Sequence, residues 1–102
     1  MSLCSSKTYH VFFSNLANPL RIQIITSLQE KEKCVMDLSK ELGVEQSKLS
    51  HALASLRLCN IVEVRQKGKE RVYTLNKKTV VPILKLIDQH AKSFCKNGCK
   101  CK

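Results

Sequence analysis

The most reactive side chains of this 102-residue chain are its six cysteines, and three of them fall between residues 95 and 101. Gly98 allows the backbone to turn between Cys95 and the pair Cys99 and Cys101, so three sulfurs could converge on one ion. Thiolates are soft ligands that suit arsenite, antimonite, cadmium, lead, copper(I) or zinc, and the neighbouring lysines favour the thiolate form. Three thiols without a histidine favour a three-coordinate species such as arsenite or antimonite. Four-coordinate zinc or cadmium would recruit a further thiol from among Cys34, Cys59 and Cys4.

Other interpretations of these cysteines stay open. Thiols that lie near one another form disulfides readily, so oxidation could change the geometry of the protein as a metal would. Residues 95–102 could also be a basic tail whose cysteines have no role, or part of a metal-chaperone or metal-storage protein. The chain between the cysteines has regular helical patterns, which is typical of an intracellular, cytoplasmic protein rather than of an exported disulfide scaffold.

Before the tail, residues 34–56 have the pattern of two short amphipathic helices joined by a tight turn. Apolar side chains recur at helical spacing in both helices, and Gly43 suits the left-handed backbone at the end of the first. The second helix runs from about residue 46 to residue 59, and one of its faces is polar. A helix of this kind after a brief turn matches the recognition helix of a helix-turn-helix, which enters the DNA major groove. The residues expected to face DNA are Gln46, Ser47, Lys48, Ser50 and His51.

After residue 60 the hydrophobic period changes from that of a helix to that of a strand. β-Branched residues alternate on both sides of residues 66–70, a polar segment that contains Gly68, and this predicts a β-hairpin. Helices followed by one hairpin make a winged helix, so the expected fold class is mainly α with a small β-hairpin. The hairpin carries cations that are placed to contact phosphate or the minor groove, although an exposed solubilising turn is the alternative. These cations are Arg65, Lys67, Lys69 and Arg71.

The remaining segments are predicted to be helices that complete a dimer. Residues 8–17 and 20–28 are separated by Asn18, which can cap a helix, and Pro19, which fits a first helical turn. The charged run 29–33 is interpreted as a solvated helix end and loop. Residues 79–94 form a last helix that is too apolar for one small core. We therefore expect a homodimer through the terminal helices, with two recognition helices about one DNA turn apart on an inverted-repeat operator.

The composition narrows the classes of function. The chain has 18 Lys and Arg against 8 Asp and Glu, and the formal net charge of +10 favours a polyanion such as double-stranded DNA as the partner. The length predicts one domain, residues 1–94, followed by a cysteine-rich tail, residues 95–102. No apolar run is long enough to span a membrane and no signal peptide is apparent, so we expect no membrane partner. The absence of a catalytic constellation, a phosphate-binding glycine loop or clustered carboxylates indicates that the protein is not an enzyme.

Three segments, taken together, resemble the ArsR/SmtB family of winged-helix metal-responsive repressors. They read LANPLRIQII at 16–25, CVMDLSKELGVEQSKLSHALASLR at 34–57 and NIVEVRQKGKERVYTL at 60–75. The combination is specific, whereas any one segment would be weak. The resemblance implies a dimeric repressor that leaves its operator when an inducer binds. It also implies that Gln46, Ser47, Ser50 and His51 face the bases, and that Arg57 holds phosphate together with the hairpin cations.

The inducer sites of that family can be compared with this chain. In arsenic and antimony sensors, one site resembles CVCDL. Here Cys34 keeps the first thiol and Met36 replaces the second, and Met36 is interpreted as a packing residue. Another arrangement uses thiols around the end of the recognition helix; Cys59 matches one of them, and Ser55 stands at its partner's position. The zinc site across the last helices is not plausible, because its positions hold Lys77, Thr79, Gln89 and Ser93.

Overall fold

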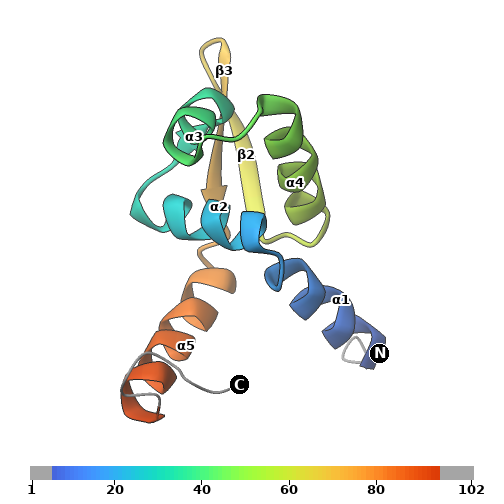
Figure 1. Ribbon diagram of the computed structural model, residues 1–102, viewed down its shortest axis with the longest axis vertical. Helices are drawn as coiled ribbons and strands as arrows, with labels where there is room; N and C mark the ends of the chain where they lie inside the picture. Colours follow the sequence, from blue (N-terminus) through green and yellow to red (C-terminus); the bar gives the residue numbers. More distant parts are fainter. Residues whose placement is uncertain (1–5, 95–102) are drawn as a thin grey trace.

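The computed structural model describes residues 6–94, which form five helices and a small sheet. Figure 1 shows a body made by the middle helices and the sheet, with the first and last helices extending from one end of it and diverging. The β2–β3 turn lies at the opposite end of the body. The mainly α winged-helix fold is therefore confirmed. Its elements are α1 (Ser6–Leu16), α2 (Pro19–Glu30), β1 (Lys33–Cys34), α3 (Val35–Leu42), α4 (Gln46–Leu58), β2 (Val62–Lys67), β3 (Glu70–Leu75) and α5 (Val80–Phe94).

The predicted hairpin is the largest part of the sheet. β2 and β3 pair antiparallel, with Val62 opposite Leu75 at the base and Lys67 opposite Glu70 beside the turn. Gly68 occupies the turn with a φ of 64°, a left-handed conformation that glycine adopts without strain. We call β2, β3 and their turn the wing.

A third strand lies on the other side of β3 and was not expected from the sequence. The strand order is β1-β3-β2, and β1 pairs Lys33 with Tyr73 and Cys34 with Val72. The interpretation of residues 29–33 as a solvated end and loop is therefore wrong at its last position, because Lys33 is only 6% exposed. A two-residue strand is too short to show an alternating pattern of its own.

Local signals define the helix ends that set the helix-turn-helix. The Asn18 side chain caps α2 by accepting a hydrogen bond of 3.2 Å from the backbone N–H of Arg21, and Pro19 occupies the first helical position. Gly43 ends α3 with a φ of 66°, and its N–H donates to the carbonyl of Ser39 at 2.9 Å. Both ends agree with the sequence prediction.

The core lies where α2 packs on β3, α4 packs on β2, and α3 packs on both helices. Its apolar stripes follow the helical period predicted for α3 and α4. Burial of these side chains removes apolar surface from water and fixes the orientation of α4 about its axis. The largest side chains that are fully buried are Ile24, Leu38, Leu49, Leu53, Leu56, Ile61 and Val62.

Several large apolar side chains are exposed in the single chain. Met36 is 52% exposed, so its interpretation as a packing residue is wrong within one chain. In α5 only Val80 is buried, whereas Leu86 and Ile87 are 64% and 51% exposed. Across residues 6–94 there is no helix that combines the length and the apolar character needed to cross a membrane.

Candidate nucleic-acid interface

Helix α4 presents a polar face to solvent because its apolar side is held in the core. Leu49, Leu53 and Leu56 are fully buried and lie on one side of the helix. The opposite side exposes the residues predicted to face DNA. Within residues 6–94, none of these side chains has a hydrogen-bond or ion-pair partner, so their polar groups are available to a ligand. They are Gln46, Ser47, Lys48, Ser50, His51 and Arg57.

Five of these residues lie near the N-terminal end of α4, and Arg57 does not. Figure 1 shows the N-terminal end of α4 at the same end of the body as the turn of the wing. At about 1.5 Å per residue, Arg57 lies roughly 16 Å along the helix axis from Gln46. Arg57 therefore marks the far end of the polar face, toward α1.

The four cations of the wing form two pairs with different surroundings. Arg65 forms an ion pair with Glu32, and the Nζ of Lys67 lies 3.4 Å from the other oxygen of the same carboxylate. Both cations remain largely exposed, at 60% and 68%. In the described part of the chain, Lys69 and Arg71 have no carboxylate partner. Two of the four wing cations are therefore engaged within the protein.

The electrostatics of Glu32 follow from these two contacts. The hydrogen bond from Arg65 is the main cause that lowers the pKa of Glu32 below its ordinary value of 4.5, and Lys67 lowers it further. Partial desolvation acts in the opposite direction. Glu32 is consequently ionised at neutral pH and attracts both cations.

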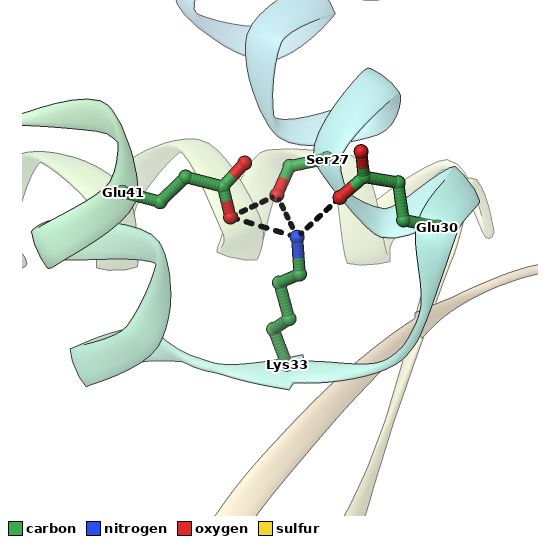
Figure 2. A network of polar contacts seen from close by, with 4 residues as sticks. All are labelled: Ser27, Glu30, Lys33 and Glu41. Atoms are coloured by element: carbon green, nitrogen blue, oxygen red, sulfur yellow. Dashed lines mark hydrogen bonds and ion pairs between the residues drawn. The ribbon is translucent and has the colours of Figure 1, made fainter.

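A buried lysine joins the helix-turn-helix to the rest of the body (Figure 2). The Nζ of Lys33 donates to Ser27 Oγ at 2.7 Å on α2 and to Glu41 Oε1 at 2.7 Å on α3. It also lies 3.2 Å from Glu30 Oε1, and the Ser27 hydroxyl donates to Glu41 at 2.9 Å. The network therefore ties α2, β1 and α3 together and positions the helix that precedes the recognition helix.

This network keeps its charges at neutral pH. The hydrogen bond with Glu41 is the main cause that raises the pKa of Lys33 above 10.5, and it outweighs the effect of burial. Hydrogen bonds from Lys33 and Ser27 lower the pKa of Glu41 below 4.5. The sequence offered no local signal for this cluster, because the carboxylate and hydroxyl that satisfy Lys33 come from two other elements.

Asn15 is a second buried polar residue that sequence reasoning missed. It is 7% exposed, and its amide donates to Cys59 Sγ at 2.8 Å. Its carbonyl accepts from the guanidinium of Arg21 and, at 3.4 Å, from the hydroxyl of Ser55. Asn15 thus connects α1 to α2 and to the C-terminal end of α4. The sequence did contain a signal for it. Asn15 follows Val11 by four residues, so it lies on the apolar side of the predicted first helix, where a polar side chain needs a partner.

The two thiols within the described residues lie close to DNA-facing elements. Cys34 is 9% exposed, and its Sγ lies 4.0 Å from Glu70 Oε2 at the start of β3. Cys59 directly follows α4 and lines a hollow of about 420 Å³ whose other lining residues belong to α1. Both cysteines are free thiols.

Residues 6–94 do not by themselves assemble a metal site. They contain no group of three or more His, Cys, Asp or Glu side chains that could hold an ion. Cys34 and Cys59 belong to different parts of the fold, so each would need ligands from elsewhere. The predicted tail ligands Cys95, Cys99 and Cys101, and Cys4, lie outside the described residues. The thiolate site therefore stays a prediction.

Comparison with known proteins agrees with the fold. A family model described as "Bacterial regulatory protein, arsR family" matches residues 18–64, which span α2 to α4 and the start of the wing. A "Transcriptional repressor SmtB homolog" from Synechocystis sp. is 33% identical over 90 residues, which cover 88% of this chain and 68% of that protein. The "Transcriptional activator HlyU" of Vibrio cholerae is 35% identical over 77 residues, which cover 76% of this chain and 71% of that protein.

Solved structures show the same relationship in three dimensions. HlyU from Vibrio cholerae superimposes with a TM-score of 0.75 at 31% sequence identity and covers 92% of this chain and 99% of that one. NolR from Sinorhizobium fredii superimposes with a TM-score of 0.70 at 29% identity and covers 92% and 97%. The SmtB homolog and HlyU are transcriptional regulators rather than enzymes. This chain accordingly belongs to the ArsR/SmtB family and is a winged helix-turn-helix transcriptional regulator.

Proposed function

We propose that this protein is a homodimeric repressor that binds a duplex operator of inverted-repeat symmetry and is released by a thiophilic metal or metalloid such as arsenite. The observation that supports DNA binding is the exposed polar face of α4, whose side chains have no partner within residues 6–94. Short polar side chains of a recognition helix read base edges in the major groove, and wing cations contact phosphate or the minor groove. The net charge of +10 adds attraction that does not depend on DNA sequence.

A second copy of the chain is the proposed partner of the apolar faces of α1 and α5. Tyr9 and Phe13 on α1 are 52% and 58% exposed, and Leu86 and Ile87 on α5 are 64% and 51% exposed. These four apolar side chains lie on two helices that project from the body. Exposed apolar patches of this kind are typical of a protein interface. A twofold dimer would present two copies of α4 to successive turns of the duplex.

Sedimentation of a charged variant tests the dimer. Changing Leu86 and Ile87 together to Glu should convert a dimer into a monomer, because two carboxylates would be buried without partners in the interface. The monomer should then lose most of its affinity for a two-half-site duplex. Leu58→Glu is the matched control, because Leu58 is 85% exposed on α4 and should leave the dimer intact. A wild-type chain that sediments as a monomer would refute the proposed assembly.

The proposed inducer site uses the tail thiols Cys95, Cys99 and Cys101, with Cys34 or Cys59 as a further ligand. The position of Cys34 supports a coupling role, because it ends β1, directly precedes α3 and contacts Glu70 of the wing. An inducer bound there would act on both DNA-facing elements. It would release DNA only to the extent that it binds the released conformation more tightly than the DNA-bound one.

The DNA-binding proposal is tested by selecting duplexes from a random library and measuring binding by fluorescence anisotropy at several salt concentrations. We expect an enriched inverted repeat and an affinity that falls steeply with salt. Gln46→Ala and His51→Ala should weaken binding to the enriched duplex and leave a scrambled duplex unaffected. Lys69→Gln with Arg71→Gln should weaken both. Absence of any preference for a selected duplex would contradict the proposal.

The inducer is tested by titrating arsenite into the protein–DNA complex. Release should occur with the wild type and with Cys4→Ser, and should be lost when all three tail cysteines are changed to Ser. Ultraviolet absorption of the purified protein with each metal would report thiolate coordination directly. Unchanged release from the triple variant would remove the tail from the sensor role.

A thiol-based redox switch is the second candidate, and one observation favours it. A solved structure of HlyU from Vibrio cholerae, 32% identical with a TM-score of 0.72, is described as the reduced form. In this chain, the half-buried Cys59 thiol beside the α1 hollow is the group that we propose would be oxidised. Release by hydrogen peroxide that dithiothreitol reverses, without release by arsenite, would favour this candidate over the metalloid.

A further inference from the structure

We propose that Glu32 limits the affinity of the wing for phosphate: its carboxylate pairs with two of the four wing cations and so restrains binding to DNA of any sequence. The inference rests on the proposed DNA-binding function and adds a residue to it that lies outside the recognition helix. Arg65 and Lys67 both contact this one carboxylate, through its two different oxygens. A phosphate that contacts these cations must therefore compete with Glu32.

Glu32 is held firmly enough to compete. It immediately precedes Lys33, whose side chain is buried in the network of Figure 2 and whose backbone pairs with Tyr73 in the sheet. The backbone beneath the carboxylate is thus fixed by β1, and little further ordering is needed to hold the two cations. Glu32 itself is 30% exposed, so its negative charge would repel a nearby phosphate.

The cations remain able to contact DNA. Arg65 and Lys67 lie two residues apart on β2, so they point to the same side of the strand, and both are more than half exposed. Each of these two cations can therefore pair either with the carboxylate of Glu32 or with a phosphate of the duplex. Because every duplex has the same phosphates, the suppressed contacts are those that carry no sequence information. Recognition by the face of α4 is unaffected by this competition.

The consequence is a smaller dependence of binding on salt than the number of wing cations alone would predict. Each phosphate neutralised by a cation contributes about 0.9 to the slope of log affinity against log salt. Lys69 and Arg71 contribute to this slope in the wild type. Arg65 and Lys67 contribute fully only when Glu32 is replaced by the neutral Gln. For a dimer, the slope should become steeper by up to about 3.6 when four cations are released.

The test compares Glu32→Gln with Glu63→Gln by anisotropy, using the enriched duplex and a scrambled duplex of equal length. Glu63 is the matched control, because it lies on the same strand two residues before Arg65, is exposed, and has no ion pair within residues 6–94. Glu32→Gln should raise affinity for the scrambled duplex on the order of tenfold at low salt and steepen its slope. Affinity for the enriched duplex should rise by a similar factor, because both duplexes offer the same phosphates. Glu63→Gln should change the slope much less.

A second set of variants keeps the test independent of the folding of Glu32→Gln. Arg65→Gln with Lys67→Gln should reduce the wild-type slope less than Lys69→Gln with Arg71→Gln. Adding Glu32→Gln to the first pair should raise affinity for the scrambled duplex less than Glu32→Gln alone does, because Arg65 and Lys67 are no longer there to be released. Equal effects of the two cation pairs, or a Glu32→Gln variant that behaves as Glu63→Gln, would overturn the role of Glu32 while leaving DNA binding intact. A wild type that binds no duplex would overturn the proposed function itself.

Discussion

Replacing Asn15 with alanine should destabilise the protein, although Asn15 lies near the end of the first helix, where a polar residue would ordinarily be exposed. Asn15 is 7% exposed, and its side-chain amide donates to Cys59 Sγ at 2.8 Å and accepts from the guanidinium of Arg21. Two further contacts, to the Val11 carbonyl and from the Ser55 hydroxyl, are longer at 3.4 Å. Alanine would remove all four and would loosen the attachment of α1 to the body.

The expected loss can be estimated from the two shorter contacts. A hydrogen bond to a charged group contributes about 1.5–3 kcal/mol to the free energy of unfolding, and a neutral one about 0.5–1.5 kcal/mol. Arg21, Ser55 and Cys59 are only half-buried, so water replaces part of what they lose. We therefore expect a decrease of about 2 kcal/mol in the free energy of unfolding. For a domain of this size that corresponds to a fall of roughly 10 °C in the melting temperature.

Asn18→Ala provides the control, because it removes one exposed capping hydrogen bond only three residues away. Loss of such a cap costs about 1 kcal/mol. Melting curves followed by circular dichroism, at one fixed protein concentration, would measure both variants. The Asn15 variant should also expose Cys59 to faster labelling by a thiol reagent. The reasoning would be refuted by an Asn15 variant that melts no lower than the Asn18 variant and labels at the wild-type rate.

Three further predictions concern the core, a turn and the buried lysine network. Leu53→Ala should lower the free energy of unfolding by about 2–5 kcal/mol, measured by urea unfolding, because Leu53 is fully buried and its removal leaves a cavity. Gly43→Ala should cost about 1 kcal/mol in the same assay. The cost is that of placing a side chain at a φ of 66°, since no atom lies within 4 Å of the added Cβ, and Gly43→Asn should cost less. Glu41→Gln should reduce stability at neutral pH, because the pKa of Glu41 is lower in the folded protein than its ordinary 4.5. A carboxylate with a lowered pKa stabilises the fold above its unfolded pKa, and this stabilisation disappears as pH falls through the folded pKa. The wild type and the Glu41 variant should therefore converge in acid, and a constant difference across the pH range would contradict the ion pair with Lys33.

Much of the fold could be predicted because its signals are local. The spacing of Leu49, Leu53 and Leu56 defined both the extent of α4 and the side that the core would bury. Gly43 and the Asn18-Pro19 pair marked helix ends, because each end requires a particular backbone conformation or cap. The alternation around Gly68 predicted the hairpin and its turn. The polar face of α4 followed directly, since a helix whose apolar side is buried must present its other side to solvent.

The parts of the candidate site that escaped prediction are contacts between distant segments. β1 has two residues and exists only because β3, almost forty positions later, offers an edge to pair with. The same holds for the carboxylate of Glu32, whose partners on the wing are recognised only when the hairpin folds back beside it.

By itself, the sequence determined the helices, the hairpin, the helix-turn-helix and the sign of the surface charge, because backbone preference and hydrophobic period act over a few residues. Only the tertiary structure decided which polar groups are buried and which cations are already paired. Lys33, within a run of charges that resembles a solvated loop, is buried because Ser27 and Glu41 meet it there. Arg65 and Lys67, identical in kind to Lys69 and Arg71, differ from them because one carboxylate lies within reach. The energy of a charge depends on the distance to its neighbours in space, and that distance is established only when the chain has folded.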